Sequence, residues 1–433
     1  MPARPPKKPV RRRVQSLSLA ERIVLRLDES RAARWLTVSV IVAPVLVVAS
    51  IFWASSPGAL SHDVTLLQPP KIAARSGSPE GTLAMLDLAP PHPAGSFVIP
   101  AEFERQQAMF LGCNELVQHH PRAMVEIIAA LQGRLALYGL IEGDVQKQRV
   151  LQLLAERGLS DSSITLLEVP MTGMWVRDSG PNILRRSDGT LTFLDTGYLD
   201  GLPNDQRPKD DQIPLRLAAI FKQPVVSVPM SCEGGNILSN GQGIGITTDG
   251  LIRANAHRSY ETRDVGRILS DYFGFQSWVV VPSLVGEPTS HIDIAVALTA
   301  PNVAVVSQLS PAVDPENARI LDRYAELLAQ AQTRQGPMRV ERIPMPTHAD
   351  GLWRSYTNVI FANGAILVPT YPDVAGTMDQ AALQLYARLL PNWKVIPIDC
   401  STLVRNHGML RCVSANVPWP TAEPIQTAST AKP

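Results

Sequence analysis

The chain has 433 residues, 45% of them hydrophobic, and a formal net charge of +1, so it is long enough for one large domain or two ordinary ones. The charge is unevenly spread, because residues 1–34 carry ten basic and three acidic side chains while the remainder carries 30 basic and 36 acidic ones. A mildly acidic body gives no basis for nucleic-acid binding, so no nucleic acid is expected as a partner.

An uncharged run of apolar residues, 35–54, follows this basic tail. Its length matches the hydrocarbon core of a bilayer, and Trp35 and Trp53 stand near its ends, where interfacial aromatic side chains are common. The basic residues precede it, which predicts a cytoplasmic N-terminus. We expect an uncleaved single-pass anchor that places the catalytic domain outside the cytoplasm. A cleaved signal peptide and a buried core helix are the alternatives.

Residues 55–96 are rich in Pro, Ser, Gly and Ala, a composition typical of a linker. The folded body is predicted over 97–420, where short apolar strands alternate with amphipathic helices. A disordered tail is expected over 421–433.

Hairpins and helices recur in this body every 60 to 70 residues. Hairpins are predicted over 294–308 and over 357–371, the second with Asn363-Gly364 at its turn. Helices are predicted before the first hairpin, over 262–275, and between the two hairpins, over 315–333. The spacing predicts a repeated ββαβ unit within an α/β fold.

Four segments combine residue types that suit catalysis. They are "WVRDSGP" at 175–181, "CEGGN" at 232–236, "SHIDI" at 290–294 and "NHGMLRC" at 406–412. Each has an ordinary interpretation by itself: a turn with a salt bridge, a glycine turn, a hydrogen-bonded pair and a buried thiol. His291 and Asp293 are two apart on a strand-like run, which predicts that both side chains project from one face.

In this order the four segments resemble the motifs of the agmatine deiminase and bacterial peptidylarginine deiminase family, within the guanidino-group-modifying superfamily. That family has W-x-R-D-x-G-P, E-G-G-N, H-[IV]-D and a Gly-rich loop that ends in a cysteine. The likeness covers residues 98 to about 420. It implies a five-bladed, pseudo-symmetric α/β-propeller, the pentein fold, with the site on its central axis.

The resemblance also implies roles for particular residues. Asp178 and Asp293 would hold a substrate guanidinium, a planar cation that carboxylates bind in bidentate geometry. Cys412 would attack its carbon as a thiolate. His291 would protonate the departing ammonia and then activate water. No cofactor or metal is required for this chemistry.

Trp175, Glu233 and Asn236 are carried over as substrate-binding positions. Three roles stay open for Glu233: assisting at the guanidinium, orienting His291 or bracing its loop.

The expected substrate is a small-molecule or peptide guanidino compound, either agmatine or free or peptidyl arginine. A body outside the cytoplasm suits peptides or scavenged arginine compounds. Arg207 and Lys209, near a predicted rim, would read a peptide carboxylate, with a solvated surface loop as the alternative.

The cysteine loop departs from the family pattern, because two glycines are missing and Arg411 stands where His is usual. A noncatalytic binder of guanidino compounds therefore remains an alternative, as does amidine transfer. A metal-dependent hydrolase is a further alternative, with His291, Asp293, His348 and Asp350 as ligands. The four cysteines show no disulfide framework in their spacing, and the oligomeric state is not predicted.

Overall fold

The computed structural model describes residues 97–198 and 209–421. The predicted basic tail, anchor and linker lie outside these residues, and so does Arg207. The chain divides into two compact units, Met1–Leu66 and Leu67–Pro433, and every element described below belongs to the second. Within the described ranges, no helix is both long enough and apolar enough to span a bilayer.

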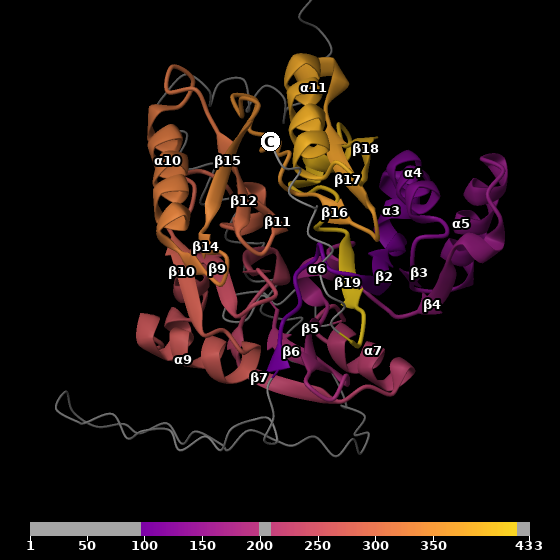
Figure 1. Cartoon of the computed structure of the whole chain (residues 1–433). Helices are drawn as coiled ribbons and strands as arrows, with labels where there is room; N and C mark the ends of the chain where they lie inside the picture. The colour runs from indigo at the N-terminus through magenta and orange to yellow at the C-terminus, as the bar shows by residue number, and fades with distance from the viewer. Residues whose placement is uncertain (1–96, 199–208, 422–433) are drawn as a thin grey trace, which may run out of the picture. The chain divides into compact units, whose positions relative to one another are not determined.

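The described part of the chain repeats one structural unit (Figure 1). In each repeat two strands pair antiparallel, and after a helical connection a third strand pairs parallel to the second one. A helical crossover is needed there because two parallel strands cannot be joined by a tight turn. The predicted ββαβ recurrence is therefore confirmed.

Four sheets follow this plan in chain order. The first two contain β5 (Asn182–Arg186), β6 (Leu191–Gly197), α7 (Ile213–Phe221) and β7 (Val225–Ser231), then β8 (Leu238–Ser239), β9 (Ile244–Thr248), α9 (Thr262–Phe273) and β10 (Ser277–Val281). The next two contain β11 (Val296–Ala300), β12 (Val303–Gln308), α10 (Pro315–Gln330) and β15 (Arg339–Pro344), then β16 (Ile360–Phe361), β17 (Ala365–Thr370), α11 (Pro372–Leu389) and β18 (Lys394–Asp399).

A fifth sheet joins the two ends of the body. The C-terminal strand β19 (Ser414–Pro418) pairs antiparallel with β2 (Gln106–Gly112) near the start. The sheet continues with β3 (Ala136–Ile141) and β4 (Thr165–Glu168). Helices α3 (Cys113–His119) and α4 (Pro121–Leu131) connect β2 to β3, and α5 (Asp144–Glu156) connects β3 to β4. The pairing of β19 fixes the cysteine loop, because Cys412 stands two residues before that strand.

Smaller elements complete the described fold. They are β1 (Phe97–Val98), which pairs with β5, the short helices α6 (Val176–Ser179) and α8 (Gly250–Ala254), and the hairpin of β13 (Gln332–Thr333) and β14 (Gly336–Pro337).

Local sequence explains several of these elements. Asn363 and Gly364 take φ of 41° and 82°, which suits a tight turn with left-handed residues and joins β16 to β17 as predicted. Helix α9 begins with a capping box of Glu261 and Asp264 and ends at Gly274, whose φ is 73°. The buried side chains of α9 recur three and four residues apart, and they pack this helix against β7 of the preceding sheet.

The largest buried cluster contains side chains from the third, fourth and fifth sheets and their helices. Among them, Ile128, Val305, Leu367 and Tyr386 are fully buried. In Figure 1, α10 and α11 each lie along their own sheet.

Two expectations about local structure were wrong. Residues Ile292–Ile294 form a 3₁₀ turn, so His291 and Asp293 do not share one face of a strand, which begins only at Val296. In addition, residues 182–186 were not predicted as a strand, yet they form β5. Its arginines obscured the signal, because Arg185 is buried and paired with Glu104 at 2.8 Å.

Candidate active site

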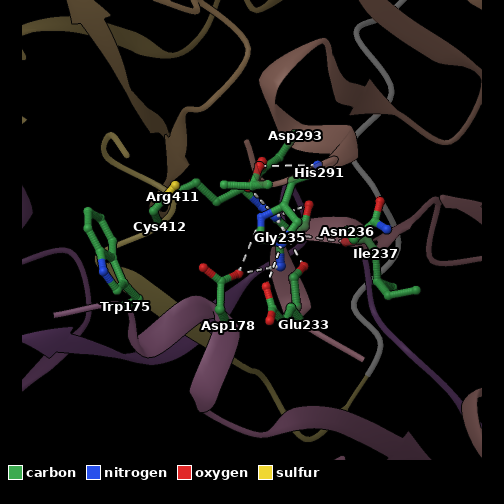
Figure 2. A network of polar contacts seen from close by, with 12 residues as sticks. Trp175, Asp178, Glu233, Gly235, Asn236, Ile237, His291, Asp293, Arg411 and Cys412 are labelled. Atoms are coloured by element: carbon green, nitrogen blue, oxygen red, sulfur yellow. Dashed lines mark hydrogen bonds and ion pairs between the residues drawn. The ribbon is translucent and has the colours of Figure 1, made fainter. Parts of the chain in front are cut away.

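The predicted catalytic residues occupy equivalent places in the repeated unit, in the loop that precedes the first strand of a sheet. These loops contribute Trp175 and Asp178 before β5, Glu233 before β8, His291 and Asp293 before β11, Asn358 before β16 and Cys412 before β19. Figure 2 shows most of these side chains around one centre. The repetition therefore gathers residues that are more than 200 positions apart in the chain.

His291 lies between two carboxylates. Its Nε2 is 2.8 Å from Oε2 of Glu233, and its Nδ1 is 3.7 Å from Oδ1 of Asp178. The imidazole is 6% exposed. Of the three roles left open for Glu233, this contact supports orienting the histidine.

Gly235 allows this close arrangement. Its N–H donates to Oδ1 of Asp178 at 2.9 Å. A Cβ at this position would stand 2.4 Å from Nδ1 of His291 and 2.6 Å from Oδ1 of Asp178. The second glycine of "CEGGN" is thus required by the proximity of the His291 and Asp178 side chains.

Arg177 is not the partner of Asp178, although the two are adjacent in the chain. Its Nη1 lies 2.9 Å from Oε1 of Glu102, and its Nη2 donates to Oδ1 of Asn416 at 2.8 Å. Asp178 is thereby left with the Gly235 N–H and the imidazole of His291. No arginine or lysine of the described residues is paired with its carboxylate, and the role of Asp178 in binding a guanidinium stays a prediction.

Cys412 is buried beside Asn358, a residue that the sequence analysis did not single out. Nδ2 of Asn358 lies 3.4 Å from the Cys412 Sγ, and Oδ1 of Asn358 accepts from the Arg411 N–H at 2.8 Å. The Cys412 carbonyl accepts from the Arg177 N–H at 3.2 Å. These contacts hold the side chain and the backbone of Cys412 in place. Asn358 is the last residue of "SYTN", residues 355–358, which resembles the S-Y-x-N motif of the deiminase family, and this was the available signal.

Asp293 is fully buried, and an internal guanidinium occupies one of its oxygens. Nη1 of Arg411 lies 2.7 Å from Oδ2 of Asp293. Oδ1 has no hydrogen-bond partner among the described residues. Of the two acids predicted to hold the substrate, Asp293 therefore offers one oxygen.

The carboxylates dominate the electrostatics of this centre. Burial raises the pKa of Asp178 to about 6, against the opposing charge of His291. Burial lowers the pKa of His291, but Asp178, the hydrogen bond and charge of Glu233, and Asp293 outweigh it and raise that pKa to about 10. Burial, with the charges of Asp293 and Asp178, raises the pKa of the Cys412 thiol well above its usual range.

Trp175 packs against the cysteine loop. A Cβ at residue 408 would approach its ring to 2.2 Å, which explains the one glycine that this loop retains. His407, one residue earlier, takes a left-handed φ of 61°. The loop therefore makes its turn without the glycines usual in the family, and Cys412 still lies within the cluster of acids.

Two further predicted binding residues have other contacts. Oδ1 of Asn236 accepts from the N–H groups of Thr248 and Ile292, both at 3.1 Å, so this side chain braces the motif loops against each other. Lys209 is paired with Glu142 at the surface. This contact fits the solvated-loop alternative.

The four-ligand metal set is not assembled. Nε2 of His348 lies 2.8 Å from Asp314, and Asp350 is held by Arg354 at 2.6 Å. A different trio in the described residues does converge, since ligand atoms of Asp178, Glu233 and His291 lie within 4.8 Å of one another. All four cysteines are buried free thiols.

The family model for Porphyromonas-type peptidyl-arginine deiminase matches residues 98–418. The chain belongs to this family. The predicted relationship is confirmed, and with it the class of enzyme, an amidine hydrolase that deiminates a guanidino group.

Named relatives agree with this assignment. A protein of Marinomonas sp. (strain MWYL1), provisionally named an agmatine deiminase, is 23% identical over 362 residues, covering 74% of this chain and 94% of its own length. Two solved structures share the fold. An arginine deiminase, provisionally so named, from Porphyromonas gingivalis has a TM-score of 0.66 at 23% identity, covering 76% of this chain and 100% of its own. The agmatine deiminase of Enterococcus faecalis has a TM-score of 0.65 at 18% identity, covering 75% and 97%. The α/β-propeller-like fold is confirmed in this way.

Proposed function

We propose that this protein hydrolyses a guanidino group to a ureido product and ammonia through a covalent intermediate on Cys412. The observation that carries the proposal is the convergence of one thiol, one imidazole and the carboxylates of Asp178 and Asp293 in a buried centre (Figure 2). In the net reaction, a guanidinium and one water give a urea and an ammonium ion.

Substrate binding uses the excess of negative charge. Asp178 and the unpartnered Oδ1 of Asp293 are acceptors for guanidinium N–H groups, and such charge-assisted bonds are strong in a buried site. The bound cation would sit with its carbon in front of the Cys412 sulfur, so that attack becomes an intramolecular step.

Thiol activation is coupled to this binding. Without substrate, burial and two carboxylates keep the Cys412 thiol protonated. A cation placed between these carboxylates and the sulfur offsets their charge and favours the thiolate. The nucleophile is thereby generated when its target is in place.

His291 supplies the protons. The raised pKa keeps its imidazole protonated near neutral pH, so it is poised as the acid that protonates departing ammonia. After ammonia has left, the neutral imidazole takes a proton from the water that attacks the thiouronium carbon. Glu233 holds Nε2 throughout.

We further propose that residues 35–54 anchor the protein and place this domain outside the cytoplasm, on the basis of the sequence pattern alone. Free or peptidyl arginine compounds suit that location better than a cytoplasmic polyamine precursor does. Agmatine remains the substrate named for relatives in the comparison.

A substrate panel tests the proposal directly. Purified protein is incubated with agmatine, free arginine, and peptides with internal or terminal arginine, and ureido product and ammonia are measured. We expect both products in equal amounts from at least one substrate, and no turnover by Cys412→Ser.

Three results would contradict the proposal: binding without turnover, amine-dependent transfer products, or activity lost to a chelator and restored by a metal. The last would favour a metal centre at Asp178, Glu233 and His291.

A further inference from the structure

Arg411, the residue before the nucleophile, has a buried guanidinium with a partner in every direction. Its Nε lies 3.1 and 3.2 Å from the two carboxylate oxygens of Glu102, and its Nη2 lies 3.0 Å from one of them. Nη1 lies 2.7 Å from Oδ2 of Asp293. One side chain therefore connects the cysteine loop to an acid of the guanidinium site and to the segment that begins the domain.

The same guanidinium also holds the "EGGN" turn. Nη1 donates to the carbonyl oxygens of Gly234 and Gly235 at 3.2 and 3.4 Å, and Nη2 donates to the carbonyl of Ile237 at 2.9 Å. A planar fork of five donors makes such a set of contacts possible, whereas an ammonium or an imidazole cannot reproduce it.

Arg411 contacts residues that in turn contact the side chains proposed to react. Gly235, whose carbonyl Arg411 holds, donates its N–H to Asp178 and lies against His291. Asp293, whose Oδ2 Arg411 holds, keeps only Oδ1 for a substrate. A shift of the Arg411 guanidinium would therefore disturb both acids that bind the substrate.

Arg411 also borders a cavity of about 60 Å³. Glu102 and Arg177 line the same cavity, and its lining does not include Cys412 or His291. The side chain has no donor left for a substrate, since all of its N–H groups have protein acceptors.

We propose, as an extension of the proposed function, that Arg411 is a positioning residue: it holds Asp293 and the turn at 233–236 in the orientation that accepts a guanidinium, without touching the substrate. The family pattern has His at this position, so the arginine is a feature of this chain. It gives the glycine-poor cysteine loop a second attachment, to Glu102 and Asp293.

The test uses a pair of alkylating probes of equal shape, 2-chloroacetamidine and 2-chloroacetamide, on the full-length protein. Both alkylate a thiol, but only the amidine carries the cation that the two acids attract. The ratio of their rate constants at Cys412, followed by peptide mapping, reports the cation site whether or not a natural substrate is known.

Wild-type protein is expected to react faster with the amidine. Arg411→Met should lower this preference by roughly tenfold or more, the loss typical of a displaced binding group, and Arg411→Lys should lie between the two. Arg185→Met is the matched control, because it removes another buried arginine–glutamate pair, with Glu104 at 2.8 Å, that makes none of the contacts of Arg411. Its preference should stay within about twofold of wild type.

Coupling to Asp293 separates positioning from a general loss of stability. In an Asp293→Asn background, Arg411→Met should change the preference by less than about threefold, because the two residues act as a unit. Equal losses in both backgrounds would overturn the proposal.

A folded Arg411→Met protein with wild-type preference would also overturn it. If Arg411→Met does not fold, Arg411→Lys is measured instead, and a wild-type preference for the amidine in Arg411→Lys would likewise overturn the proposal. A wild-type protein that does not favour the amidine would instead contradict the proposed function itself.

Discussion

The charged groups are paired differently on the two sides of the central cluster. On the side of Cys412, the acids Asp178 and Glu233 enclose one imidazole, and Asp293 leaves an oxygen without a partner. On the other side, Arg177 and Arg411 both bind Glu102. There the guanidinium groups are the protein's own, and the carboxylates of Glu102 and Asp293 balance their two charges.

The difference shows what the first side lacks. Arg411 bound to Glu102 and Asp293 is an internal example of carboxylates holding a guanidinium. Among the described residues, the thiol side has the same kind of acceptors, Asp178 and Oδ1 of Asp293, and its internal cation is His291. The comparison predicts that changes on the thiol side affect binding and rate directly, that Arg411 affects binding through Asp293, and that changes at surface positions affect neither.

Removing a charge on the thiol side should have the largest effect. Asp178→Asn keeps the size of the side chain but removes the negative charge that attracts the substrate. We expect kcat/KM to fall by roughly a hundredfold or more, as for loss of one partner in a buried ion pair. The exposed Asp188 provides the control, and Asp188→Asn should leave kcat/KM unchanged. Steady-state ammonia release measures both.

Gly235→Ala should have the next largest effect. The added Cβ would meet His291 and Asp178 at 2.4 and 2.6 Å, so these two side chains must move apart. A displacement of this kind costs on the order of ten- to a hundredfold in kcat. Gly143→Ala is the control, because its Cβ would have open space. If Gly235→Ala turned over at the wild-type rate, the arrangement of these side chains would not matter for catalysis.

The pH profile tests the imidazole and its two acids. Activity needs ionised Asp178 and protonated His291, so kcat/KM should rise through about pH 6 and fall through about pH 10. Glu233→Gln removes a contact that raises the His291 pKa. Its alkaline limb should therefore move to lower pH, with roughly tenfold lower kcat near pH 9. If the alkaline limb of the Glu233→Gln profile lay at the same pH as in the wild type, that limb would belong to a group other than His291.

Lys209→Ala should have the smallest effect. The Lys209 side chain is paired with Glu142 at the surface, and such exposed pairs contribute little. We expect kcat/KM for agmatine and for an arginine peptide to stay within about twofold of wild type. A selective loss for peptides with a C-terminal arginine would restore the predicted role in reading a carboxylate.

The sequence was sufficient to predict the repeated unit and to select candidate catalytic residues that the fold brings together. Asp178, His291 and Cys412 stand in motifs whose order is distinctive, and the hairpin at Asn363-Gly364 follows from local turn preference alone. The strand-like pattern of "HIDIAV" was misleading, because a 3₁₀ turn places Asp293 so that Arg411 reaches it.

The supporting contacts were not predictable in the same way. Glu102 and Arg411 are 309 positions apart, and nothing in their local sequences indicates that they meet. Asn358 likewise reaches Cys412 across 54 positions. Such pairs depend on how the five sheets described here are arranged, which periodicity and motif order do not specify.

The central claim is that Cys412 becomes covalently bound to the substrate carbon during turnover. Acid quenching during steady-state turnover, followed by peptide mapping with mass spectrometry, tests it directly. We predict an amidino adduct of the substrate on the peptide that contains Cys412, present during turnover and gone once the substrate is consumed. Turnover with Cys412 unmodified at every time point, or turnover by Cys412→Ser at the wild-type rate, would contradict the account.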